Sequence, residues 1–124
     1  MATQYYEMEL NVPASTPADA PARTQENTAY PPLFLPEGTI TGVVVTVPTG
    51  ANGAVFFRLK LNGDVIFPTG SNQNGWSNLT NLSARHIPFT HDVDLFNARL
   101  DLEAYNVSSS YAYPVVIGIT EEVC

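Results

Sequence analysis

The chain has 124 residues and a formal net charge of −7, with five Lys and Arg against twelve Asp and Glu. Proteins that grip phosphate groups need a basic stripe, so this composition argues against nucleic acid and anionic membrane surfaces as partners. No apolar run approaches the length of a membrane span, and residues 1–7 lack the basic and apolar regions of a signal peptide. We therefore expect synthesis in a cytoplasm. The length of 124 residues is that of one domain, so we also expect a single hydrophobic core.

The composition favours strands over helices. Six Tyr and six Phe accompany eight Gly and ten Pro, together with many β-branched residues, a mixture typical of sheets and tight turns. Charged residues make up 14% of the chain, whereas about 25% is usual for a soluble protein. So sparse a charge is typical of a surface that is partly covered by neighbouring molecules, and it also occurs in small β domains.

The N-terminal segment Tyr5–Val12 alternates, with Tyr6, Met8, Leu10 and Val12 on one side, which predicts a strand. Residues 13–28 follow, with three prolines and no large apolar side chain. Such a stretch cannot bury a core face of its own, and is either a linker or an arm laid across another surface. We therefore divide the chain into an extended N-terminal arm, residues 1–29, and a β-sandwich domain, residues 30–124.

Short strands with turns between them fill the rest of the chain. Strands are expected at residues 39–47, 54–61, 64–67, 86–90, 98–105 and 113–120. Asn62-Gly63 predicts a tight hairpin turn, and Pro88 predicts an edge position for its strand. This pattern is that of an all-β, antiparallel, jelly-roll-like β-sandwich. Alternation places these residues in the core: Val55, Phe57, Leu59, Leu61, Leu100, Leu102, Val115, Ile117 and Ile119.

The search for catalytic or metal-binding residues favours no site. His86, His91, Asp92 and Asp94 lie close together in sequence, but residues five apart in a strand point to opposite faces, and a solvated turn is the simpler interpretation. The sequence has no nucleophile elbow and no phosphate loop. The only cysteine, Cys124, is the last residue and has no partner for an internal disulfide. We expect neither an enzyme nor a bound cofactor.

Two groups of aromatic residues are candidates for binding a partner. Trp76 lies in the polar loop 69–81, where it would either stack on a sugar ring or pack against the sandwich or a neighbouring subunit. Tyr105, Tyr111 and Tyr113 bracket the last hairpin, and tyrosine is enriched at protein interfaces.

Two hairpins resemble those of the small β-sandwich virion proteins of tailed bacteriophages. The first is the hairpin over residues 57–68, followed by the loop with Trp76, and the second pairs residues 100–108 with residues 115–119. The resemblance covers residues 38–120 at most. It implies a capsid decoration (cement) protein that sits on the outer shell of a virion as a homotrimer and reaches its neighbours with an arm.

The leading hypothesis is therefore a structural virion subunit, made in the host cytoplasm, that binds the major capsid protein or another virion protein. The arm would staple neighbouring subunits together by adding a strand to their sheets. The alternative is a carbohydrate-binding or tail-associated module that uses the Trp76 loop. The residues predicted to bind a partner are Tyr5, Tyr6, Met8, Leu10, Trp76, Tyr105, Tyr111 and Tyr113.

Overall fold

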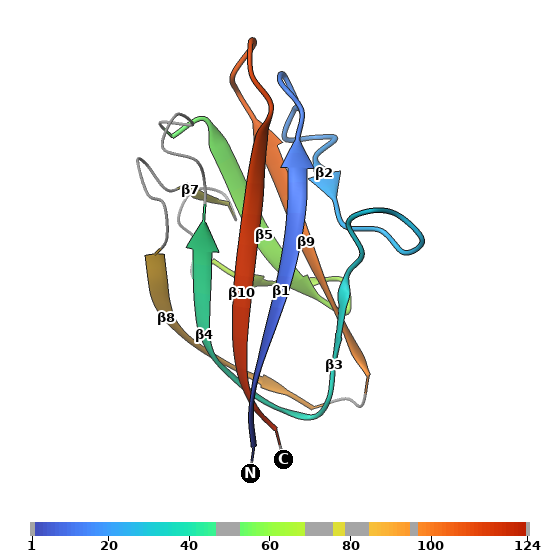
Figure 1. Cartoon of the computed structure of the whole chain (residues 1–124), viewed down its shortest axis with the longest axis vertical. Helices are drawn as coiled ribbons and strands as arrows, with labels where there is room; N and C mark the ends of the chain where they lie inside the picture. The colour runs from blue at the N-terminus through green and yellow to red at the C-terminus, as the bar shows by residue number, and fades with distance from the viewer. Residues whose placement is uncertain (1, 47–52, 69–75, 79–84, 95–96, 124) are drawn as a thin grey trace.

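Two antiparallel sheets pack face to face in the computed structural model, which describes residues 2–46, 53–68, 76–78, 85–94 and 97–123 (Figure 1). The first sheet has the order β1 (Ala2–Val12), β10 (Tyr113–Val123), β4 (Gly38–Thr46) and β8 (Arg85–Val93). The second has the order β2 (Ala22–Arg23), β9 (Ala98–Asn106), β5 (Val55–Leu61) and β6 (Asp64–Phe67). Two short strands complete it: β3 (Leu33–Leu35) pairs with β9, and β7 (Ser77–Asn78) pairs with β5.

The path of the chain between the sheets is that of a jelly roll. The chain runs from β1 in the first sheet to β2 and β3 in the second, returns for β4, makes the β5–β6 hairpin in the second, and then alternates through β8, β9 and β10. The first and last strands are therefore neighbours, as are strands that lie far apart in sequence. The predicted all-β, antiparallel sandwich is confirmed.

The predicted strand register is also correct. Phe57, Leu59, Leu100 and Leu102 are fully buried between the sheets, as are Val115, Ile117 and Ile119. Leu61, at the end of β5, is only half-buried against this core. The Asn62-Gly63 turn has the positive φ values, 50° and 90°, that a two-residue hairpin requires. The strand with Pro88, β8, lies at a sheet edge as predicted.

The prediction of a separate arm at residues 1–29 is wrong for residues 2–12. These residues form β1, which pairs with β10 from Ala2↔Val123 to Val12↔Tyr113 without a register shift (Figure 1). Met8 and Leu10 are each 3% exposed and belong to the core of the chain itself. An amphipathic strand needs a sheet edge and an apolar surface, and β10 of the same chain supplies both.

Residues 13–29 form a strap that runs along the β9 edge of the second sheet of the same chain. Thr16 forms a β-bridge with Asn106, and β2 pairs with β9 through Ala22↔Ala104 and Arg23↔Glu103. The strap thus lies against a sheet of its own chain. The domain therefore begins at β1, because the strap joins β1 to the rest of the sandwich.

Two further features of the chain bear on the sequence predictions. Within the ranges given above, no helix is long and apolar enough to cross a membrane. Cys124 and most of the loop 69–81 lie outside the described residues.

Candidate functional site

Most of the basic residues of this acidic chain gather on the outer face of the second sheet. Strand alternation turns Phe57, Leu59 and Leu102 inward and leaves the residues between them outside. Four of the five Lys and Arg residues are on this face, and three acidic residues accompany them; the side chain of the fifth, Arg85, is not described. We call this set the polar face: Arg23, Glu26, Arg58, Lys60, Arg99, Asp101 and Glu103.

Glu103 is the centre of one half of the polar face. Its carboxylate is 5% exposed and lies directly across from Arg58 in the β5–β9 ladder. Arg58 donates from Nε to Oε1 at 2.8 Å and lies 2.7 Å from the same oxygen through Nη2, while Lys60 Nζ is 3.5 Å from Oε2. A buried carboxylate is tolerated when cations and hydrogen bonds compensate its lost hydration, and here two cations share one carboxylate.

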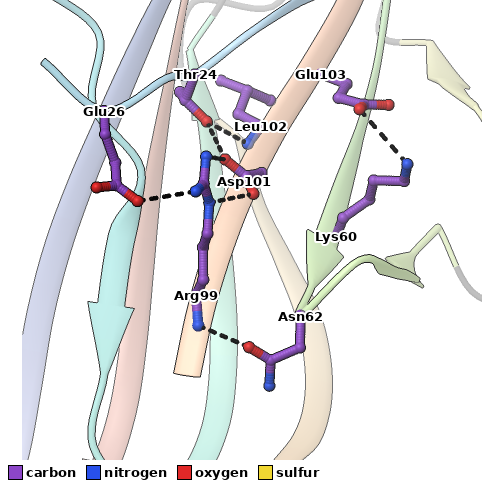
Figure 2. Close-up of polar contacts among 8 residues, drawn as sticks. All are labelled: Thr24, Glu26, Lys60, Asn62, Arg99, Asp101, Leu102 and Glu103. Carbon is purple, nitrogen blue, oxygen red and sulfur yellow. Dashed lines mark hydrogen bonds and ion pairs between the residues drawn. The ribbon is translucent and has the colours of Figure 1, made fainter. Parts of the chain in front are cut away.

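Arg99 organises the other half of the polar face and joins it to the strap (Figure 2). Its Nε donates to Asp101 Oδ2 at 2.9 Å, and its Nη1 donates to Glu26 Oε1 at 2.9 Å. Hydrogen bonding to Asp101 raises the pKa of the Arg99 guanidinium. Arg99 N also donates to Asn62 Oδ1, which fixes the β5–β6 turn against the start of β9.

Thr24 is the buried residue of the strap that joins it to Asp101 and Leu102 of β9. It is fully buried, and its Oγ1 donates to Asp101 Oδ1 at 2.9 Å while accepting from Leu102 N at 3.1 Å. The backbone N–H of Thr24 donates to Leu102 O at 3.0 Å. Figure 2 shows Thr24, Asp101 and Leu102 converging above the Arg99 guanidinium. The hydroxyl is thus satisfied as both donor and acceptor, as burial requires.

A polar furrow of roughly 590 Å³ remains between the strap and the strands. Arg23 and Gln25 line one side, and Lys60, Arg99 and Asp101 line the other. Each carboxylate of the polar face is already engaged with a cation: Glu26 and Asp101 with Arg99, and Glu103 with Arg58 and Lys60. The arrangement makes a charged surface whose carboxylates are all paired with cations.

Trp76 packs beside the polar face, on an aromatic cluster. Its ring makes an edge contact with Tyr105 at 4.7 Å, and Tyr105 stacks on Phe56 at 4.7 Å. The guanidinium of Arg58 lies over the indole, 4.1 Å from its centroid. Trp76 is only 7% exposed, which leaves no open ring for a sugar and favours the packing alternative.

The structure divides the residues predicted to bind a partner among three places. Tyr5 and Tyr6 lie on β1 at the edge of the first sheet, with the buried Met8 and Leu10 beyond them. Tyr111 and Tyr113 lie together at the end of the last hairpin, 6.4 Å apart. Burial in the core of the chain removes Met8 and Leu10 as candidates for contact with a neighbour. Tyr105 and Trp76 share the outer face of the second sheet.

The polar face was not predicted, although the alternation of charges that indicates it is present in the sequence. Charged residues alternate with core residues in Arg58-Leu59-Lys60 and in Arg99-Leu100-Asp101-Leu102-Glu103. Opposite charges on the same face of two strands indicate an ion-pair ladder if the strands are neighbours. That β5 and β9 are neighbours could not be read from the sequence.

Two other acidic positions need a structural account. Within the described residues, no group of three His, Cys, Asp or Glu side chains could hold a metal ion. Of the residues considered for such a site, Asp92 accepts a hydrogen bond from Thr39 Oγ1 at 3.1 Å, and the ring of His91 stacks on that of Phe89. Glu121 of β10 points into the sandwich beside Gly38 and has no hydrogen-bond partner among the described groups. Burial raises the pKa of Glu121.

Comparison with known proteins supports the fold. No protein-family model matches the sequence, and no curated protein matches it. A chain of the cyanophage Pam1 capsid asymmetric unit is similar in structure, with a TM-score of 0.56 and 13% identity, over 98% of this chain and 85% of that one. An acetyl xylan esterase (Est2A) from the rumen bacterium Butyrivibrio proteoclasticus has a TM-score of 0.40 and 11% identity, over 98% of this chain and 32% of the esterase. The first likeness shows a shared β-sandwich, and the second is too low to bear on function.

Proposed function

We propose that this protein is a structural, non-catalytic virion subunit that binds other virion proteins, in the manner of a capsid decoration (cement) protein. The observation that carries the proposal is the likeness to the cyanophage capsid chain, which extends over 98% of this chain and 85% of that one. Two chains that match over most of their lengths share an architecture rather than a fragment. The resemblance of the two hairpins to decoration proteins points in the same direction.

The chemistry of the polar face supports a binding role. Its carboxylates are held by Arg58, Lys60 and Arg99, so they are arranged to stiffen a surface. A surface that is ordered before binding loses less side-chain entropy when a partner docks. A decoration subunit needs this property because it docks onto an assembled lattice without reshaping it.

The proposal includes the assembly and location that the resemblance implies. The subunit would be made in the host cytoplasm, form a homotrimer, and bind the major capsid protein on the outer shell. Several weak contacts per trimer would then act together, since each bound subunit raises the effective concentration of the other two near their sites.

Sedimentation with virions tests this function. Purified protein mixed with capsids that lack it should co-sediment in saturable amounts, and native mass spectrometry of the free protein should give the mass of a trimer. The control is an unrelated β-sandwich of similar net charge, which should stay in the supernatant. Failure of the protein to bind any virion component, or its absence from purified virions by mass spectrometry, would overturn the proposal.

A further inference from the structure

The free edge of β1 is unusual for an edge strand. β1 runs over eleven residues and is at the end of the first sheet, paired with β10 on one side and with no other strand of the described residues. Natural edge strands are protected by proline, charged side chains (lysine above all), bulges or short length, and of these β1 has only the two carboxylates of Glu7 and Glu9. β1 contains neither proline nor lysine, and its pairing with β10 has no register shift. The opposite edge, β8, contains Pro88 and is protected in this way.

The side chains beside this edge carry negative charge. Alternation exposes Thr3, Tyr5, Glu7, Glu9 and Asn11 on the outer face of β1. Glu122 of β10 lies on the same face, where it accepts from Thr3 Oγ1 at 2.8 Å. No ion pair among the described side chains includes Glu7 or Glu9; the cations of those pairs, Arg58, Lys60 and Arg99, are on the second sheet.

The outer face beside these acids is hollowed. A hollow of roughly 280 Å³ is lined by Glu7, Met8 and Glu9 of β1 and by Val116 of β10, which pairs with Glu9, so it lies over the β1–β10 pair next to the two acids. Tyr5 beside it is 54% exposed, and its ring lies over Gly118 of β10. A side chain on an added strand would have both an aromatic ring and two carboxylates within reach.

A second copy of this chain does not fit the edge. Pairing β1 with β1 would bring the Glu7 and Glu9 carboxylates of both copies onto one face, and like charges across a ladder are destabilising. The only basic residues that alternate within a strand, Arg58 and Lys60, are in β5, between β9 and β6 in the second sheet. The occupant must therefore come from a different polypeptide.

We propose that the free edge of β1 binds an extended segment of a partner protein whose outward side chains are lysine or arginine at alternate positions. The segment adds a strand to the first sheet, and its cations pair with Glu7 and Glu9. Backbone hydrogen bonds along the edge supply affinity, and the two acids select the sequence and register. This inference rests on the proposed function, which requires contact with other virion polypeptides, and it names the chemistry of that contact.

Synthetic peptides test the edge directly. The full chain is titrated with an eleven-residue peptide that alternates Lys with Thr or Val, and NMR amide shifts are followed. Shifts should concentrate on residues 2–12, and a peptide with Glu in place of Lys should not bind. N-methylation of alternate residues on the pairing edge of the basic peptide should abolish binding, because it removes the ladder donors.

Charge variants provide the matched control. The Glu7→Gln/Glu9→Gln variant should bind the basic peptide roughly tenfold more weakly, whereas Asp19→Asn/Asp64→Asn, which removes two exposed charges elsewhere, should change affinity by less than about twofold. Equal binding of Lys and Glu peptides, shifts that map to β8 or to the polar face, or equal loss in both variants would overturn the proposal. So would concentration-dependent β1 shifts without peptide, which would identify a second copy as the occupant.

Sedimentation separates this inference from the proposed function. If the wild type co-sediments with capsids and Glu7→Gln/Glu9→Gln does so equally well, the protein is a virion subunit and the edge is not its docking site. If the wild type does not co-sediment, the proposed function fails whatever the peptides do.

Discussion

Residues 2–12 and the strap, residues 13–29, are consecutive in the chain but are held in the fold by different forces. β1 pairs with β10 over its whole length and buries Met8, Leu10 and Val12 in the core. Among residues 13–29, all of which the structure describes, Thr24 alone is buried. β1 is therefore stabilised mainly by apolar burial, and the strap by a few directed polar contacts. The difference predicts how each segment responds to mutation.

Deleting residues 1–12 should have the largest effect. The deletion removes three buried side chains, worth about 1.5–3 kcal/mol each, from a domain whose total stability is of the order of 5–15 kcal/mol. It also exposes the edge of β10. We expect the truncated chain to be unfolded or aggregated, measured by circular dichroism and size-exclusion chromatography.

If the truncated chain cannot be purified, a point substitution in β1 measures how much its buried side chains contribute to stability. Leu10→Ala should lower the free energy of unfolding by about 2–5 kcal/mol, and its exposed neighbour Glu9→Ala should change it by less than about 0.5 kcal/mol. A truncated chain that stays soluble with an unchanged β spectrum, together with a small effect of Leu10→Ala, would mean that β1 is an accessory strand.

Replacing the buried hydroxyl of the strap should have an intermediate effect. Thr24→Val keeps the shape of the side chain but leaves the buried N–H of Leu102 without its acceptor, while Asp101 Oδ1 loses one of its two donors and keeps Arg99 Nη2 at 3.3 Å. An unsatisfied buried group costs about 1–3 kcal/mol, so chemical denaturation should show a loss in that range. The matched control is Glu26→Gln, which weakens an exposed ion pair to Arg99 and should fall within the scatter of the titration. Equal effects of the two variants would show that the hydroxyl is not what holds the strap.

The sequence predicts the features that depend on alternation within a strand. It does not predict which strands pair with each other. The register of β5, the Asn62-Gly63 turn and the core positions from Phe57 to Ile119 follow from periods of two and from turn chemistry. The same alternation in Tyr5–Val12 correctly predicted a strand, but pattern alone does not say whether the sheet that receives it belongs to the same chain. Because the strap is rich in proline, its sequence did not predict the short strand β2 that pairs with β9.

The polar face shows a similar limit. Arg58 and Glu103 are 45 positions apart, and only the antiparallel pairing of β5 with β9 brings them together. Trp76 was recognised as an aromatic residue in a polar loop, yet its burial depends on Arg58 and Tyr105. Long-range pairing of this kind is fixed by the topology of the whole sandwich and leaves no mark within a short window of sequence.

The smallest expected effect concerns Glu121, a buried carboxyl on the core-facing side of β10 whose partner on β1 is Gln4, two positions before Tyr6. Burial raises the pKa of its carboxyl in the folded state. Burial, and to a smaller extent the charge of Glu121, raises the pKa of Tyr6. The folded protein therefore holds a proton that the unfolded chain releases at its ordinary pKa. The sign follows from linkage: this contribution to stability is fully present below the unfolded pKa and is lost as the pH rises through the folded one.

Glu121→Gln should remove that loss. Measured by urea denaturation between pH 4 and pH 7, the variant should gain stability relative to the wild type as the pH rises, with the two closest together at the acidic end. Glu122→Gln removes the same charge from the outer face of the same strand and should leave most of the pH dependence in place. Curves for Glu121→Gln and wild type that stay parallel across this range would mean that the carboxyl is not titrating inside the fold. Glu121 would then add no pH-dependent term to the stability of the β1–β10 pair. Burial of the apolar side chains of β1 would be enough to explain why β1 packs against the core.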